Sequence, residues 1–181
     1  MTEEATVAIL DDPKKIEASF ERTRKQILTL LSDKEMTLTQ ISKRLGLSKR
    51  SISHHLQILL ERELISLTSM RINEYGIQEK FYRAKALVLL GDFNKSSRRV
   101  KEETLESNRD IVIGYLCARP KAKISDKKLD ELAYSFTLMV QKVSREHAKV
   151  RNTRTQTKLA IYKEAFKRLE KDKEWQSIEQ S

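Results

Sequence analysis

The sequence predicts a mainly α-helical protein that carries one small β-hairpin. Apolar residues recur at helical spacing over most of the chain, and its 181 residues include only four glycines and two prolines. One short region shows instead the alternating pattern of strands. With 39% apolar and 34% charged residues, the composition is typical of a modest core with much solvated helix.

The stretch from Thr37 to Leu60 predicts two short helices joined by a tight turn. Thr37 is a suitable N-cap with Gln40 at capping-box spacing, and Gly46 is suited to end the first helix in the left-handed conformation. Ser48 can cap the second helix, which has one apolar stripe. Such a pair is a helix-turn-helix, whose second helix enters the major groove of DNA. The alternative is an ordinary helical hairpin with a solvated polar face.

A β-hairpin is predicted directly after the second helix. Ile65, Leu67 and Ser69 alternate with polar or smaller residues, as in a half-buried strand. Residues 73–76 are turn formers, and residues 78–84 form a second short strand. A helix-turn-helix followed at once by a hairpin is a winged helix, so the fold class is a winged helix-turn-helix followed by long C-terminal helices.

Here the sequence resembles the ArsR-type winged helix-turn-helix regulators of prokaryotes and archaea, over about residues 16–87. The resemblance rests on LGLSKRSISHHLQIL (45–59), ERELI (61–65) and EKFYRA (79–84). The serine–x–histidine–leucine signature is met approximately, because His54 and His55 both stand between Ser53 and Leu56. The resemblance implies a DNA-binding regulator whose first helix contributes to a subunit interface. Many such relatives sense metals through cysteines in or near the helix-turn-helix; residues 37–60 contain none, so this sensing chemistry is not predicted.

The polar face of the second helix supplies the predicted base contacts. The recognition helix spans about residues 49–60, and its long or hydrogen-bonding side chains suit phosphates and base edges. The wing, about residues 71–80, leans basic and is predicted to hold the DNA backbone; a solvated hairpin edge protected by charge is the alternative. The full predicted set is Thr37, Ser48, Lys49, Arg50, Ser53, His54 and Gln57, with Arg71 and Lys80 on the wing.

The chain divides into four predicted parts. Residues 1–13 form a partly ordered arm, and 14–90 form the winged helix, whose first helix starts at Pro13 and runs to about Leu31. Residues 91–120 form a hinge and a connecting helix that runs from its cap, Ser97, to about Cys117. Residues 121–181 form a long helical or coiled-coil dimerisation region.

The last helix is predicted to start after Ser125 and to run to about Lys173. Its apolar positions step by three and four, as in a coiled-coil seam, and a later change of step suggests a stutter or a break. We expect this seam to pair two chains in a homodimer, which suits two DNA half-sites; an intramolecular helical hairpin is the alternative. The seam is Leu129, Leu132, Phe136, Met139 and Val143.

Residues 147–163 are basic and contain no acidic residue. On a continuous helix Arg151, Arg154 and Lys158 share a face, which predicts secondary phosphate contacts. A solvated basic face and a disordered hinge are the alternatives.

Charge and motifs limit the function. The formal charge of +10 indicates an anionic partner, nucleic acid before an acidic membrane surface. No P-loop, dinucleotide fingerprint or nearby triad carboxylate is found, so no enzyme and no cofactor is predicted. The single cysteine, Cys117, excludes an internal disulfide framework, and the adjacent His54 and His55 are a poor pair for one metal ion.

The predicted function is sequence-specific binding of double-stranded DNA by a homodimeric transcriptional regulator. A signal peptide and a membrane span are not predicted, so a cytoplasmic, nucleoid-associated protein is expected. The sequence does not identify the small-molecule effector, which stays unknown at this point. Two alternatives are an architectural protein that coats DNA with little specificity, and a protein-interaction module that uses the C-terminal coil.

Overall fold

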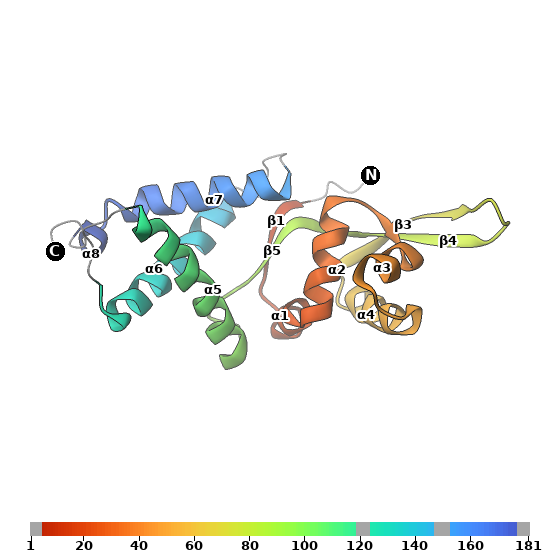
Figure 1. Cartoon of the computed structure of the whole chain (residues 1–181), viewed down its shortest axis with the longest axis horizontal. Helices are drawn as coiled ribbons and strands as arrows, with labels where there is room; N and C mark the ends of the chain where they lie inside the picture. The colour runs from red at the N-terminus through yellow and green to blue at the C-terminus, as the bar shows by residue number, and fades with distance from the viewer. Residues whose placement is uncertain (1–4, 119–123, 147–152, 177–181) are drawn as a thin grey trace.

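The computed structural model describes residues 5–118, 124–146 and 153–176. The molecule is elongated, with a β-hairpin at one end and the C-terminal helices at the other (Figure 1). Between them lie the four short helices of the winged helix. The mainly helical fold with a winged helix-turn-helix and C-terminal helices confirms the predicted fold class.

The winged helix has the helix caps and the turn that the sequence predicts. Helices α3 (Leu38–Leu45) and α4 (Lys49–Glu61) are joined through Gly46, which has φ 67°. Thr37 Oγ1 accepts from Gln40 N at 3.2 Å, and Gln40 Oε1 accepts from Thr37 N at 3.0 Å, so the capping box is present. Strands β2 (Met36–Thr37), β3 (Ile65–Ile72) and β4 (Gln78–Ala84) form an antiparallel sheet in the order β2-β4-β3.

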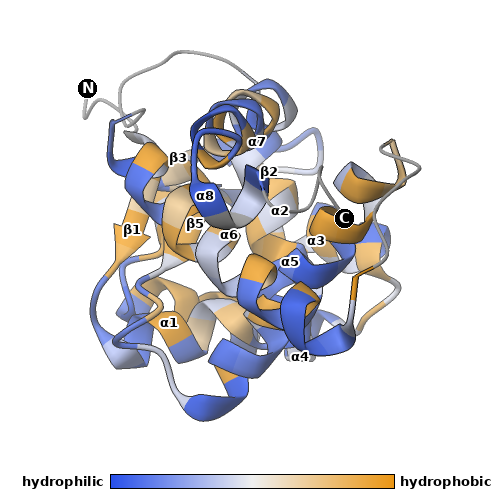
Figure 2. Cartoon of the chain, turned by 90° about the vertical axis from the view of Figure 1, so that its left-hand side faces the viewer, coloured by the Kyte–Doolittle hydropathy of each residue, from blue (hydrophilic) through white to orange (hydrophobic). Residues whose placement is uncertain are grey.

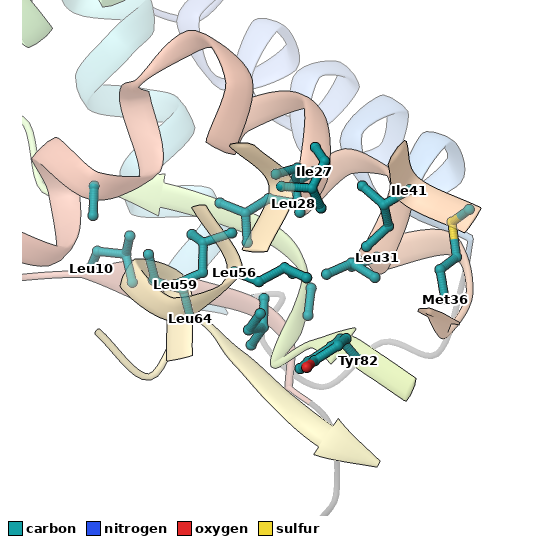
Figure 3. Packing of buried hydrophobic residues seen from close by; sticks show 14 of the residues in the cluster. Leu10, Ile27, Leu28, Leu31, Met36, Ile41, Leu56, Leu59, Leu64 and Tyr82 are labelled. Atoms are coloured by element: carbon teal, nitrogen blue, oxygen red, sulfur yellow. The ribbon is translucent and has the colours of Figure 1, made fainter. Parts of the chain in front are cut away.

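The apolar stripes of these helices meet over the sheet in one core. Ile27, Leu31, Ile41 and Leu59 are fully buried, and Tyr82 of β4 closes the core from below in the close-up (Figure 3). Burial of a side chain of this size stabilises the fold by roughly 1.5–3 kcal/mol. The core therefore fixes α4 with its apolar stripe inward and its polar face outward.

The predicted first helix is in fact two helices. α1 (Pro13–Phe20) begins as expected, with Asp12 as N-cap and Pro13 in the first turn. The chain then breaks at Glu21, which has φ −64° and ψ 135°, and α2 (Arg22–Asp33) follows. The Glu21 carboxylate accepts from the backbone N–H groups of Thr23 and Arg24, at 3.0 and 2.9 Å. It thus caps α2. The prediction of one continuous first helix running to about Leu31 is therefore wrong.

The predicted N-terminal arm is also wrong for residues 5–10. They form strand β1 (Ala5–Leu10), which pairs in parallel with β5 (Ala86–Gly91), with Val7 beside Val88. The winged helix is inserted between these two strands. Leu10 belongs to its core, whereas Val7 and Val88 belong to the core of the C-terminal helices, so the two-stranded ribbon joins both.

A single helix from Ser125 to Lys173 does not form. The structure has α5 (Arg98–Cys117), α6 (Asp126–Glu146), α7 (Arg154–Leu169) and the short α8 (Lys173–Gln176). Capping by Ser97 and Ser125 is confirmed, since each hydroxyl accepts from a backbone N–H three residues on. A separate cap, Thr153, starts α7 with its own capping box.

The predicted seam of α6 is covered within the chain. Its residues Leu132, Phe136 and Val143 are fully buried together with Val112 of α5 and Ile161 of α7. Phe136 stacks on Phe166 with ring centroids 4.5 Å apart. In the end-on view α8 is mainly hydrophilic, α5 carries both hydrophilic and hydrophobic residues, and β1 is hydrophobic (Figure 2). This is the intramolecular hairpin, and no coiled coil between chains is needed to bury the stripe.

Candidate DNA-binding surface

The polar face of α4 is exposed as predicted. Lys49, Arg50, Ser53, His54 and Gln57 all lie at the surface, while Ile52, Leu56 and Leu59 point into the core. The Gln57 amide donates to the Glu61 carboxylate at 3.0 Å, an exposed contact one turn away. The other four side chains are exposed on the same helix, as residues that read a groove must be.

The helix-turn-helix has no acidic residue between positions 36 and 60. Within that stretch Lys43 and Arg44 lie in the last turn of α3, and Lys49 and Arg50 in the first turn of α4. All four are exposed. The positive end of the α4 dipole adds to their field at the turn. The turn therefore presents concentrated positive charge to an anionic surface.

Lys43 and Arg44 were missed in the sequence-based set. Their signal was available: cations at the end of the first helix of a helix-turn-helix lie where that helix crosses the DNA backbone. Ser42 of the same turn donates its hydroxyl to the Leu47 carbonyl at 2.6 Å, which orders the turn. We include Lys43 and Arg44 in the candidate surface.

The two predicted cap residues differ in position. Ser48 is exposed and accepts from Ser51 N at 3.1 Å, so it stands at the start of α4 beside Lys49. Thr37 is only 2% exposed, and its hydroxyl is used in the capping box. Burial removes Thr37 from the candidate surface, and its part is to fix the start of α3.

The two histidines have different environments. His54 is exposed, whereas His55 is half-buried with Nδ1 3.7 Å from the Glu21 carboxylate. Burial lowers the pKa of His55, and the nearby Glu21 partly opposes this by favouring the protonated ring. His55 thus serves the α2–α4 contact, as its position beside the apolar stripe predicts. Within the described residues, no group of three His, Cys, Asp or Glu side chains could hold a metal ion.

The wing holds one of its two predicted cations in an internal contact. The Arg71 guanidinium pairs with the Glu35 carboxylate and lies over the Phe81 ring, 4.3 Å from its centroid. Thr68 donates to the same carboxylate at 2.6 Å, and this hydrogen bond is the largest cause of the lowered Glu35 pKa. Lys80 is exposed and has no carboxylate within 4.0 Å in the described part of the chain.

The tip of the wing is apolar, which composition alone did not indicate. Ile72, Tyr75 and Ile77 are 75, 77 and 60% exposed. Gly76, at φ 75°, and Asn73, whose Oδ1 accepts from Tyr75 N and Ile77 N at 3.0 Å, shape the turn between the strands. The predicted basic wing is therefore a basic stem with an apolar tip.

The three residues predicted to make secondary phosphate contacts have different positions. Arg151 lies outside the described residues. Arg154 stands at the start of α7, and Lys158 one turn later is half-buried against α2 and α5. Lys158 therefore does not belong to a freely solvated basic face.

Residues 21–66 match the family model described as bacterial regulatory protein, arsR family. The helix-turn-helix of this chain is of the arsR type. This confirms the resemblance over the two helices and the start of the wing. Transcriptional repressor SdpR of Bacillus subtilis is 50% identical over 44 residues, or 24% of this chain and 49% of SdpR. The chain thus spans about half the length of this curated relative.

Solved structures of similar arrangement each cover part of the chain. HlyU from Vibrio cholerae has 28% identity and a TM-score of 0.33 over 50% of this chain and 79% of HlyU. NolR from Sinorhizobium fredii has 23% identity and a TM-score of 0.34, over 54% of this chain and 80% of NolR.

Among the described residues, no helix has the length and apolarity to cross a membrane.

Proposed function

We propose that this protein is a transcriptional regulator that binds specific sequences in double-stranded DNA. The observation that carries the proposal is the exposed α4 face on an arsR-type helix-turn-helix. In this proposal Arg50, Ser53, His54 and Gln57 meet base edges in the major groove. Lys49 and Ser48 at the start of α4, with Lys43 and Arg44 of α3, contact the phosphates that position it.

The wing has a smaller part in this proposal. Lys80 reaches the backbone, and Arg71 is turned toward Glu35 and Phe81 and stiffens the stem of the hairpin. Stiffening matters because a two-stranded hairpin is marginally stable alone. The apolar tip formed by Ile72, Tyr75 and Ile77 extends beyond the stem and is available to a groove edge.

We further propose that the regulator acts as a homodimer. Two recognition helices reading half-sites about one helical turn apart would double the contacts and raise specificity. The support for a dimer is the match between two recognition helices and two DNA half-sites. A coiled coil does not support it, because the α6 seam is buried within one chain. Light scattering at micromolar concentration tests it: a mass of twice 21.1 kDa is expected, and a mass of one chain would contradict it.

The proposal is tested by selecting bound duplexes from a random pool and measuring affinity at two salt concentrations. A regulator is expected to bind the selected sequence about a thousandfold or more tighter than random DNA. A ratio near one with a steep salt slope would instead indicate an architectural coat. An absence of DNA binding at physiological salt would favour a protein-interaction module.

A further inference from the structure

A pocket of about 190 Å³ lies between the winged helix and the C-terminal helices. Its walls come from α1 and α2 on one side and from α5 and α7 on the other, with β5 between them. Apolar side chains of β5 and Leu28 line part of it, and hydroxyl and amide groups of α5 line another part. The pocket thus has an apolar wall and a polar wall, which is the usual make-up of a small-molecule site.

Three cations and one carboxylate line the pocket: Lys25, Arg154, Lys158 and Glu103. Arg154 and Lys158 stand one turn apart on α7 and both line the pocket. Within the described parts of the chain neither has a carboxylate within 4.0 Å. Lys25 of α2 lines the opposite side, and it pairs across the pocket edge with Glu103 of α5 at 3.2 Å, while Glu103 also pairs with Arg99 at 3.3 Å. Glu103 is therefore already shared by two cations.

The environment of Lys158 is unfavourable for a bare cation. Burial is the largest cause that lowers its pKa, and the charges of Arg154 and Lys25 lower it further. Tyr162, one turn along α7, has its pKa raised by burial, so its hydroxyl stays protonated and can donate a hydrogen bond. An anion in the pocket would relieve the repulsion between the cations and accept from all three groups.

We propose that this pocket binds a small organic anion, with a carboxylate held by Arg154 and Lys158 and an apolar body against β5 and Leu28. The planar guanidinium fork of arginine matches a carboxylate and adds directional contacts to the charge of the lysine. The apolar wall argues against a sugar–phosphate backbone, which has no apolar body to place there. Arg154 and Lys158 are thereby assigned to a ligand within the fold.

The position of the pocket gives the ligand a route to DNA binding, and this consequence rests on the proposed function. α2 packs against the recognition helix through the buried core, and α5 and α7 belong to the C-terminal helices. A ligand that contacts α2 and α7 together changes how tightly these parts are joined. Such differential binding is what an effector requires.

The test is calorimetric titration of the full-length protein with benzoate and with benzamide, its uncharged isostere. Benzoate is expected to bind saturably and benzamide not to bind. Arg154→Gln and Lys158→Met are each expected to weaken benzoate about tenfold or more, because each removes a charge-assisted hydrogen bond. Lys163→Met, an exposed lysine on the same helix, is the matched control and is expected to leave affinity unchanged.

Two further measurements test the same site independently of the variants. Benzoate is expected to shift the amide resonances of Ser107, Asn108 and Tyr162, a readout that needs no variant. Inorganic phosphate that displaces benzoate and binds more tightly would overturn the assignment of an apolar body. No saturable benzoate binding, or unchanged affinity in both variants, would overturn the site. DNA affinity measured in parallel separates this outcome from failure of the proposed function, since benzoate titration does not depend on DNA.

Discussion

The side-chain amide of Gln141 on α6 donates to the carbonyl oxygen of Gly91 at 2.8 Å, where β5 ends. Beside it, Arg145 pairs with Asp92 at 3.1 Å, and Asp92 N donates to the Leu10 carbonyl at 2.7 Å. Gly91 itself has no room for a side chain, because a Cβ would lie 2.9 Å from Ile16 Cγ2. The C-terminal helices are thus tied to the ribbon that enters and leaves the winged helix.

Removing this tie is expected to destabilise the whole chain. Gln141 is only 8% exposed. Gln141→Ala therefore removes the hydrogen-bond donor to the Gly91 carbonyl at a position that is largely shielded from water. The free energy of unfolding is expected to fall by about 1–3 kcal/mol in chemical denaturation. Gln26→Ala, at an exposed helix position, is the control and is expected to change it little. Equal stability of both variants would show that the contact is dispensable.

The α6 seam is expected to stabilise each chain by itself. Phe136→Ala removes a fully buried ring that stacks on Phe166, and it should cost about 3–5 kcal/mol. The loss is expected to be the same at low and high protein concentration in thermal unfolding. Tyr134→Ala, at a side chain 46% exposed, should cost much less. A loss that grows on dilution would show that the seam joins two chains.

Local signals predicted the winged helix well. Thr37, Gln40, Gly46 and Ser48 each act through neighbours within a few residues, so their caps could be predicted directly. The exposed face of α4 followed from its apolar stripe. The break at Glu21 was missed because a glutamate cap is unusual and the apolar spacing continues through it.

Contacts between distant residues were the part that sequence could not supply. β1 has its partner some 80 residues away, and six residues without a clear period do not identify a strand whose mate is unknown. For α6 the periodicity identified the buried face but not what covers it, which is α5 and α7. The pocket at Lys158 is lined by five separate elements, α1, α2, β5, α5 and α7, and has no local signal.

Mild acid is expected to weaken the fold through His55. Burial lowers the pKa of this ring below its ordinary value of 6.5, so the folded state favours the neutral form. Stability is therefore present above that value and is lost as the pH falls through the lowered pKa. His55→Gln is expected to reduce the drop in melting temperature between pH 7.5 and 5.5, whereas the exposed His54→Gln should not. An unchanged drop in His55→Gln would refute this assignment.

The two wing cations are expected to differ in their effect on DNA. Lys80→Ala should make the slope of log affinity against log salt shallower by up to about 0.9, with equal loss on selected and random DNA. Arg71→Ala should change the slope less, because Glu35 already neutralises this guanidinium. Lys167→Ala on α7 serves as the control. A larger slope change for Arg71 than for Lys80 would mean that the Glu35 pair opens on DNA.

The most direct test of the account is the specificity ratio of Arg50→Ala. If Arg50 reads a base edge, Arg50→Ala should weaken the free energy of binding to the selected duplex by roughly 1–3 kcal/mol. Binding to random DNA should weaken much less. The control is Arg98→Ala, whose side chain is 92% exposed at the start of α5, away from the α4 face. Fluorescence anisotropy with both duplexes at one salt concentration measures the ratio. A clear loss of the ratio in Arg50→Ala alone is the predicted result, and an unchanged ratio would contradict the assignment of α4 as the recognition helix.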